Sequence, residues 1–189
     1  MRRLTEEVIP LSDVTGIVIY GEGRHFSSGA DLDDLISAIK GHGKSDLDQD
    51  RSSILSDNLR SFTFFENLTI PVVAAIRGVC LGSALELALF CHCRICGNGS
   101  VLGLPESTFG LIPGCGGISN MASLAGLPRT MELVLSGSSF TSEEAHQWKI
   151  VDKIVPKKDV VTAAINFIKF IPGRYNRLGM NSYIYDYMR

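Results

Sequence analysis

Two glutamates stand inside apolar stretches of the chain, where a carboxylate is an uncommon residue. Glu86 lies within the leucine-rich residues 85–89, and Glu106 closes the segment 103–106. Burial among apolar side chains disfavours a charged carboxylate and raises its pKa. A carboxyl group tuned toward neutral pH suits general acid–base catalysis, so the two glutamates are candidates for an acid–base pair. The structural alternative places Glu86 at the positive end of a helix and makes Glu106 a turn residue.

Small residues form two loops that each follow a predicted strand and precede a predicted helix. These loops are residues 27–31 and residues 82–84. Small side chains let backbone N–H groups approach a ligand closely, and a helix start adds partial positive charge. Two such amides that converge on one oxygen form an oxyanion hole. Together with the glutamates, the loops predict a site where charge develops on an oxygen next to an acid–base pair.

Apolar runs and turn signals divide the chain into alternating strands and helices. Strands are predicted at residues 14–20, 71–76, 93–96 and 100–103, and a short strand or extended segment at 149–155. Helices are predicted at 31–40, 51–66, 84–91, 118–125, from Pro128, after Thr141 and at 160–171. Residues 41–50 are polar and glycine-rich, which indicates a mobile surface loop. Residues 141–144 read as a capping box. Strands that alternate with helices predict an α/β fold.

Composition excludes several classes of function. The formal charge of −2 offers no basic excess for nucleic acid, so we expect no nucleic-acid partner. No apolar stretch reaches the roughly 18–20 residues that a membrane span needs, so we expect no membrane partner. The basic start, Met1-Arg2-Arg3, is followed by polar residues and does not resemble an export signal. With an odd number of cysteines, five, the chain is expected to be cytoplasmic with reduced thiols.

Three segments resemble motifs of one enzyme family. Residues 74–89, AAIRGVCLGSALELAL, resemble the signature segment of the enoyl-CoA hydratase/isomerase family, the crotonase superfamily. Residues 24–32, RHFSSGADL, resemble its first oxyanion loop, and residues 104–117, LPESTFGLIPGCGG, resemble its second catalytic segment. The three motifs occur in the family's order and spacing, over a region that runs from about residue 14 to residue 155.

The resemblance implies a crotonase-like fold, an α/β spiral of repeated ββα units followed by a helical C-terminal region. Residues 1–155 would form the core, and residues 156–189 a C-terminal helical region that is not an independent domain. Family members are usually longer, so this chain resembles a member shortened at the N-terminus and also at the C-terminus. The family further implies a homotrimer or a dimer of trimers.

The resemblance also assigns roles to residues. The backbone N–H groups of Ala30 and Ser83 would form the oxyanion hole for a thioester carbonyl. Glu86 and Glu106 match the two glutamates of the hydratase members, which implies reversible hydration of a 2-enoyl-CoA to a 3-hydroxyacyl-CoA. Isomerase members often keep only the second glutamate. The implied substrate contacts are Ser28, Asp31, Leu32, Leu81, Gly82, Pro105 and Gly114.

Other activities remain open at this point. One alternative keeps the fold and changes the reaction to an isomerase, dehydratase, decarboxylase or hydrolase. Another is a non-catalytic acyl-CoA-binding or assembly subunit, which the shortened termini suggest. For every catalytic reading, coenzyme A enters as part of the substrate, and we expect no tightly bound cofactor and no metal.

A few cysteines and histidines could support different chemistry. The cysteines of residues 91–96 could form a metal cluster, but they lack a second ligand pair at suitable spacing, so we interpret them as buried core residues. Cys115 could act as a nucleophile if a base lay within reach. His25 flanks the first oxyanion loop and could contact an anion, or it could be an ordinary loop residue. His92 stands where the family commonly has Asp, and we expect a change of packing there.

Overall fold

A computed structural model describes residues 9, 14–30 and 46–170 of the 189-residue chain, with only the backbone of residues 46–55. The strands are β1 (Ile17–Tyr20), β2 (Val72–Ile76), β3 (Val79–Leu81), β4 (Cys93–Gly97), β5 (Val101–Gly103), β6 (Ser139–Thr141) and β7 (Lys153–Val155). The helices are α2 (Asp46–Glu66), α3 (Ser83–Leu89), α4 (Gly117–Ala125), α5 (Leu127–Ser136), α6 (Ser142–Gln147) and α7 (Val160–Phe170), with the 3₁₀ turns η2 (Pro105–Phe109) and η3 (Lys157–Asp159). The helix predicted at 31–40 lies outside the described residues.

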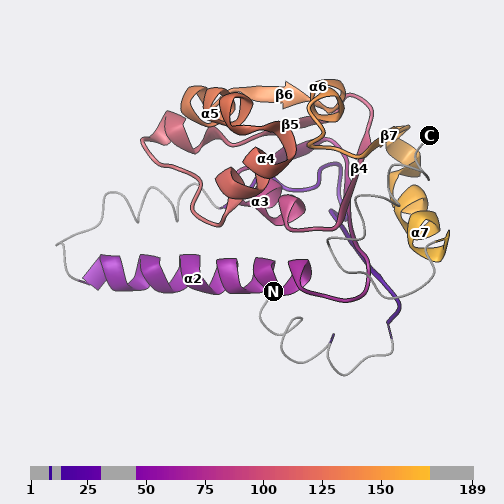
Figure 1. Cartoon of the computed structure of the whole chain (residues 1–189), viewed down its shortest axis with the longest axis horizontal. Helices are drawn as coiled ribbons and strands as arrows, with labels where there is room; N and C mark the ends of the chain where they lie inside the picture. The colour runs from indigo at the N-terminus through magenta and orange to yellow at the C-terminus, as the bar shows by residue number, and fades with distance from the viewer. Residues whose placement is uncertain (1–8, 10–13, 31–45, 171–189) are drawn as a thin grey trace.

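Two sheets organise these elements (Figure 1). Four parallel strands form one sheet in the order β1-β2-β4-β7, and a smaller sheet has the order β3-β5-β6. In the smaller sheet β3 and β5 are parallel, and β6 runs antiparallel to β5. The consecutive strands β2 and β3 therefore belong to different sheets, and helix α3 follows them. In the same way, β4 and β5 belong to different sheets, and the segment η2–α4 follows them. This arrangement repeats a ββα unit along the chain.

The strand β2 is buried on both faces, which explains its uninterrupted apolar sequence. Val73 and Ala75 point to a cluster that includes Val160 and Ala164 of α7. Side chains on the opposite face of β2 belong to the main core, together with residues of α3 and α4. Figure 1 shows α7 on one side of this sheet and the other helices beyond it. Within the described part of the chain, no helix is long and apolar enough to cross a membrane.

Several element boundaries differ from the prediction. The short strands β3 and β6 were not predicted, because three residues carry too little pattern to be distinguished from a loop. Helix α2 begins at Asp46, so the loop prediction is wrong for residues 46–50. The strand predicted at 149–155 is wrong in its first half. Both Ile150 and Val151 donate their N–H groups to the carbonyl of Ala145, in a turn that ends α6, and the strand begins only at Lys153.

The capping box predicted at the start of α6 is confirmed. The side-chain oxygen of Thr141 accepts the N–H of Glu144 at 3.2 Å, and Glu144 Oε2 accepts the N–H of Thr141 at 2.8 Å. Each residue satisfies an amide that the helix leaves unpaired at its N-terminus. The boundary between a core and a C-terminal region at residue 155 stays a prediction.

Candidate active site

Three chain segments leave the smaller sheet at one edge. A parallel bridge joins Ser27 to Cys80 of β3, and Leu81 pairs in parallel with Gly103 of β5. The amide of Leu81 donates to the carbonyl of Ser27 at 3.1 Å, and the amide of Gly82 donates to that of Gly103 at 2.9 Å. Because parallel strands end at the same edge, the three predicted motifs lie next to one another there.

Two glycines with positive φ allow these segments to approach closely. Gly29 has φ +98°, and a Cβ built on it would lie 2.7 Å from the carbonyl oxygen of Leu81 and 3.5 Å from the nitrogen of Ser83. Gly82 has φ +56°, and a Cβ there would lie 3.2 Å from Glu106 Oε1. Both conformations favour glycine, and any larger residue would press against the neighbouring segment. The loop that contains Ala30 therefore lies against the start of α3, and Glu106 lies over Gly82.

Glu86 lies in the first turn of α3 with only 2% of its surface exposed. Its Oε1 accepts the N–H of Cys115 at 2.8 Å and the N–H of Gly117 at 3.0 Å. Burial raises the pKa of Glu86, and the hydrogen bonds from Gly117 and Cys115 oppose this effect. The net direction is upward, so desolvation outweighs the two amides. The prediction of a buried, pKa-raised carboxyl group is confirmed for Glu86.

Glu106 is half-buried in η2, five residues after the start of β5. Burial raises its pKa most, its own backbone amide lowers it, and the negative charge of Glu86 raises it further. Glu106 Oε1 faces Gly82, whose carbonyl accepts the N–H of Glu86 at 3.0 Å, so the two glutamates meet at the start of α3. Among the described residues, the buried Oε2 of Glu106 has no hydrogen-bond partner. Such an unpaired buried oxygen is costly in a fold and indicates a place where a ligand or water is bound.

The loop before α4 has a role that the sequence analysis missed. It holds the Glu86 carboxylate on the amides of Cys115 and Gly117, the latter being the first residue of α4. A Cβ on Gly117 would lie 2.7 Å from Glu86 Cγ, so only glycine leaves room for this carboxylate. The glycine-rich sequence 114–117 that opens a helix was the available signal, since helix N-termini bind anions.

Cys115 does not have the properties of a nucleophile. Its side chain is buried, and burial raises the pKa of the thiol to about 12, with further contributions from the negative charges of Glu86 and Glu106. A thiol with this pKa is protonated at neutral pH and is a weak nucleophile. Its contribution to the site is therefore its backbone amide and its apolar bulk beside the two carboxyl groups.

The other predicted site residues lie around the same edge. Ser83 is the half-buried first residue of α3, Leu81 is the half-buried end of β3, and Gly82 between them is buried. Pro105 opens η2 directly before Glu106. The remaining described positions are exposed: Ser28, Ala30 and Gly114. Asp31 and Leu32 lie outside the described residues.

The two histidines that were open to other roles hold the backbone. Nδ1 of His25 accepts the N–H of Val79 at 3.1 Å. Nδ1 of His92 accepts the N–H of Val72 at 3.0 Å, and its Nε2 lies 3.2 Å from the carbonyl oxygen of Glu66. With Nδ1 as acceptor, the ring of His92 is neutral and Nε2 carries the donated proton. Both histidines therefore have structural contacts, and the change of packing expected at His92 relative to the family stays a prediction.

The cysteines of residues 91–96 are buried, as interpreted from the sequence. All five cysteines of the chain are free and buried. No group of three or more His, Cys, Asp and Glu suited to a metal ion occurs among residues 9, 14–30 and 46–170. Cys91, Cys93 and Cys96 belong to the two apolar clusters on either face of the large sheet.

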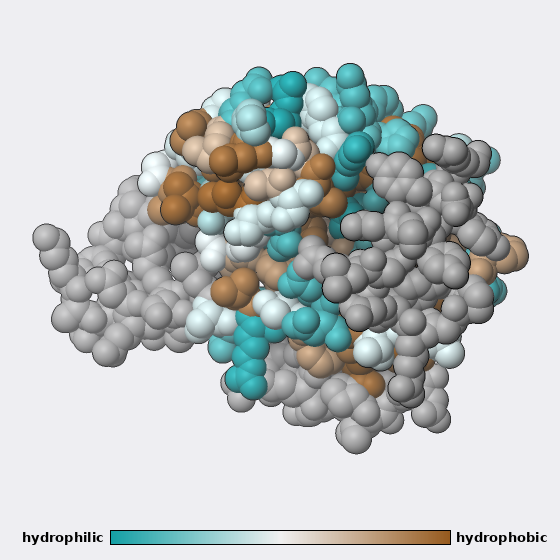
Figure 2. All heavy atoms as spheres, viewed as in Figure 1, coloured by the Kyte–Doolittle hydropathy of each residue, from teal (hydrophilic) through white to brown (hydrophobic). Residues whose placement is uncertain are grey.

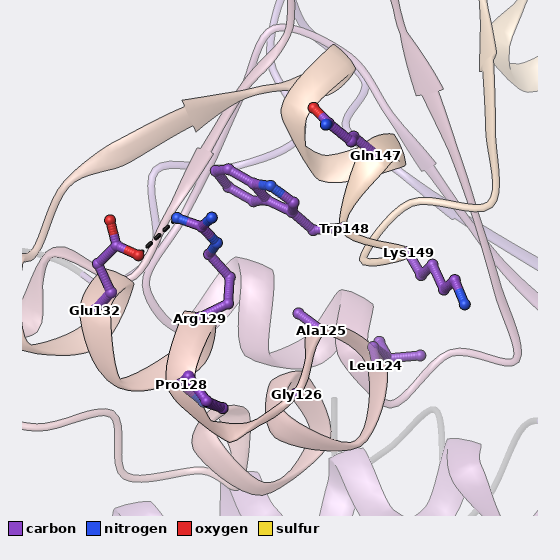
Figure 3. A pocket seen from close by; sticks show the side chains of 9 residues that line it. All are labelled: Leu124, Ala125, Gly126, Pro128, Arg129, Glu132, Gln147, Trp148 and Lys149. Carbon is purple, nitrogen blue, oxygen red and sulfur yellow. Dashed lines mark hydrogen bonds and ion pairs between the residues drawn. The ribbon is translucent and has the colours of Figure 1, made fainter.

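A separate pocket of about 620 Å³ contains neither glutamate (Figure 3). Its walls come from the end of α4, the start of α5 and the end of α6. The guanidinium of Arg129 lies 4.5 Å from the ring centroid of Trp148 and pairs with Glu132 at 2.6 Å. Arg129 and Glu132 thus neutralise each other within the chain.

Comparison with known proteins agrees with this geometry. The family model described as enoyl-CoA hydratase/isomerase matches residues 10–173. The chain is 36% identical over 169 residues to the peroxisomal fatty acid beta-oxidation multifunctional protein MFP2 of Arabidopsis thaliana, covering 89% of this chain and 23% of that protein. The crystal structure of enoyl-CoA hydratase from Bacillus anthracis superposes with a TM-score of 0.75 at 31% identity, covering 89% of this chain and 61% of that one.

A protein from Thermobifida fusca solved in complex with CoA superposes with a TM-score of 0.72 at 27% identity, covering 90% of this chain and 66% of that chain. The chain therefore belongs to the enoyl-CoA hydratase/isomerase family and has the crotonase fold. It spans less than a quarter of the length of the multifunctional relative and about three fifths of the Bacillus anthracis hydratase.

Proposed function

We propose that the protein catalyses the reversible hydration of a 2-enoyl-CoA to a 3-hydroxyacyl-CoA. One observation carries the proposal: two carboxyl groups with raised pKa lie in one environment, and Glu106 keeps a buried oxygen without a partner among the described residues. Hydration needs both an acid and a base beside the double bond. Two neighbouring carboxyl groups, both with a pKa raised by burial, can meet that need if one gives a proton while the other takes one.

The hydrogen bonds suggest which glutamate plays which role. Two amide donors stabilise the ionised form of Glu86, which favours it as the base that takes a proton from water. The negative charge of Glu86 raises the pKa of Glu106, which favours Glu106 as the acid. Since both amides donate to Oε1 of Glu86, we assign the contact with water to Oε2. The water oxygen bonds to C3 as Glu86 takes its proton, and Glu106 afterwards delivers a proton to C2 of the acyl chain.

The oxyanion hole completes the reaction. We assign it to the backbone N–H groups of Ala30 and Ser83, since Gly29 brings the two loops together. As the first residue of α3, Ser83 has an amide that the helix itself does not use. When the water oxygen adds to C3, the electron pair of the double bond moves toward the thioester, and these amides stabilise the enolate oxygen. Protonation at C2 then restores the carbonyl.

The remaining contacts follow from the position of these groups. Leu81 and Gly82 directly precede Ser83, Pro105 directly precedes Glu106, and Ser28 and Gly114 are exposed residues of the adjoining loops. We propose these residues, with Asp31 and Leu32 from the adjoining segment, as substrate contacts. Coenzyme A is present as part of the substrate. We further propose a homotrimer or a dimer of trimers, from the family resemblance, and a cytoplasmic location, which the five free cysteines support.

The decisive experiment replaces the proposed acid. Hydration of crotonyl-CoA, followed by loss of the enoyl thioester absorbance, is expected to fall in Glu106→Gln by about 10²–10⁴-fold in kcat, the usual contribution of a general acid. Binding of the substrate should change much less, because glutamine keeps the size of the side chain. Full hydratase activity in Glu106→Gln would refute the proposal. If kcat falls as much in Glu86→Gln as in Glu106→Gln, the result supports hydration over isomerisation, because isomerisation would depend on Glu106 alone.

A further inference from the structure

The pocket between α4, α5 and α6 is separate from Glu86 and Glu106 and has the size of a ligand site. Its volume of about 620 Å³ lies within the range of roughly 300–1,000 Å³ that small-molecule sites occupy. Leu124, Ala125 and Pro128 give it apolar walls, and side chains of α5 and of the end of α6 give it polar ones. In Figure 2 the surface over α5 and α6 combines hydrophobic with hydrophilic residues. A hollow of this kind suits a ligand with an apolar body and a polar head.

The charges that line the pocket leave a positive excess. Arg129 and Glu132 pair at 2.6 Å and neutralise each other. Lys149 also lines the pocket, and the ion pairs found among the described residues do not include it. The ammonium group of Lys149 is therefore the uncompensated charge. A hollow lined by one sign of charge attracts ions of the other sign, so the pocket favours an anion.

Arg129 adds hydrogen-bond donors in a fixed position. Its guanidinium lies 4.5 Å from the ring centroid of Trp148, and its Nη1 donates to Glu132 (Figure 3). A guanidinium has five N–H donors, so this contact leaves others that can bind a carboxylate or phosphate oxygen. Trp148 packs in turn on Phe140 of the core, with 5.6 Å between the ring centroids. The donors of Arg129 are thus held in place by the core of the protein.

Lys149 keeps its side chain at this pocket in spite of backbone strain. Its φ is +64°, the one positive φ of a non-glycine residue in the part of the chain that the structure describes. Glycine adopts this conformation without the strain that a Cβ brings. Residues held in such conformations gather at functional sites, where the side chain is needed. A lysine at this position therefore indicates that its ammonium group has a use in the pocket.

We propose that this pocket is a second ligand site, which binds a small organic anion. A carboxylate or phosphate head contacts Lys149 and Arg129, and an aliphatic body lies against Leu124 and Pro128. Both kinds of head have the same negative charge and acceptor oxygens, and the titrations below separate them. The inference requires no particular reaction at the glutamate site.

The fluorescence of Trp148 gives a direct test, because it is the only tryptophan of the chain. The full chain is titrated with hexanoate, hexyl phosphate and hexanol, which share one aliphatic body and differ in the head. We expect a saturable change with at least one anion, with a Kd of about 0.1–10 mM, ordinary for a ligand of so few atoms. The stronger of the two anions identifies the head group. An equal response to hexanol would overturn the proposal.

Lys149→Gly removes the ammonium group and the backbone strain together, so the variant is expected to fold. The Kd of the anion should rise about 10-fold, because a charge-assisted hydrogen bond is lost. Lys153→Gly is the matched control, since it removes the same side chain from an exposed position of β7 outside the pocket. We expect this control to keep the wild-type Kd. Equal weakening in both variants would show only a general attraction of anions and would overturn the inference.

Thermal unfolding gives an independent measurement. A ligand that binds only the folded chain raises its Tm, so the anion should raise the Tm of the wild type more than that of Lys149→Gly. The absence of a saturable response to either anion, or an unchanged Kd in Lys149→Gly, would refute the site. Glu106→Gln should bind the anion as the wild type does, even where it has lost hydratase activity. A weaker Kd in Glu106→Gln would place the anion at the glutamates and overturn the proposal.

Discussion

The carboxylate of Glu86 accepts the backbone N–H of Gly117 at 3.0 Å, which joins the first turn of α3 to the first residue of α4. The same oxygen accepts the amide of Cys115. One carboxylate oxygen is thus fixed by two donors on a rigid helix start, and the orientation of the other oxygen follows. The contact is close enough that the residue type at position 117 determines whether the carboxylate can stay in place.

Gly117→Ala tests this contact. An added Cβ would lie 2.7 Å from Glu86 Cγ and 2.9 Å from its Oε1, closer than side chains tolerate. We expect kcat for crotonyl-CoA hydration to fall by about 10–100-fold, since displacement of a catalytic group by about 1 Å has costs of this order. Gly23→Ala is the control, because a Cβ at Gly23 meets nothing within 4 Å. Equal activity of both variants would show that Glu86 does not need its present position.

The sequence predicted the two catalytic candidates, Glu86 and Glu106, but not the backbone amides that hold Glu86 in place. Glu86 could be placed in a buried helix because leucines and alanines surround it within four residues. Its amide donors lie 29 and 31 residues further along the chain, and no local pattern connects them with it. The contact exists only because α3 and α4 pack together, which is a property of the tertiary fold.

The same distinction explains which elements of the fold were missed. Strand β2 was predicted because burial on both faces leaves a continuous apolar run. Strand β3 has only Val79–Leu81, and its pairing with β5 and with Ser27 gives it an extended conformation. Ile150 and Val151 look like a strand in sequence, yet both are buried in a turn, because the apolar character reflects burial and not backbone geometry.

Glu106→Gln should stabilise the fold at neutral and alkaline pH. The folded-state pKa of Glu106 is raised above its ordinary value of 4.5, mainly by burial. A raised carboxyl pKa means that ionisation costs free energy in the folded state, so stability falls as pH rises above 4.5. Glutamine removes this cost. We expect the Tm of Glu106→Gln to exceed that of the wild type at pH 8 and to approach it near pH 4.5.

A matched variant separates this effect from a general change in stability. Glu132 is an exposed surface glutamate, so Glu132→Gln should not reproduce the pH-dependent increase in Tm. If scanning calorimetry found the same difference between Glu106→Gln and the wild type at both pH values, the carboxyl group of Glu106 would not be titrating in the folded protein. Glu106→Gln should therefore gain stability and lose activity. This combination is expected where a fold keeps a functional carboxylate in an environment that disfavours its charge.

His92 should make stability depend on pH in the acid range. Burial lowers its pKa to about 4, and the positive charge of Arg94 contributes. A histidine whose pKa is depressed in the folded state contributes stability above its unfolded pKa of about 6.5, and this contribution is lost as pH falls toward 4. Protonation of Nδ1 would also remove the acceptor for the N–H of Val72.

Urea unfolding at several pH values measures this effect. We expect His92→Ala to lose about 1–2 kcal/mol at pH 7.5, the cost of leaving the amide of Val72 without its partner. The difference from the wild type should shrink between pH 6.5 and pH 4. His92→Asn keeps an acceptor oxygen that does not titrate, so its stability should change less over this range than that of the wild type. A constant difference between His92→Ala and the wild type would contradict the assignment.

Lys149 has a backbone conformation that favours glycine. It is the one non-glycine residue with a positive φ, +64°, among the residues that the structure describes. Its amide donates to the carbonyl of His146 in the turn that ends α6. A left-handed residue directly after a helix is most often glycine, because a Cβ there is strained by roughly 1 kcal/mol. Lys149→Gly should therefore raise the free energy of unfolding by up to about 0.5 kcal/mol, once the entropic cost of glycine, about 0.5–1 kcal/mol, is deducted from the relieved strain.

The same substitution in an extended segment should have the opposite effect. Lys153→Gly changes an exposed lysine of β7, where glycine brings only its entropic cost, so the free energy of unfolding should fall by about 0.5–1 kcal/mol. Denaturant titration of both variants beside the wild type gives the two signs directly. If Lys149→Gly were destabilised as much as Lys153→Gly, the left-handed conformation at residue 149 would not be present in the folded protein.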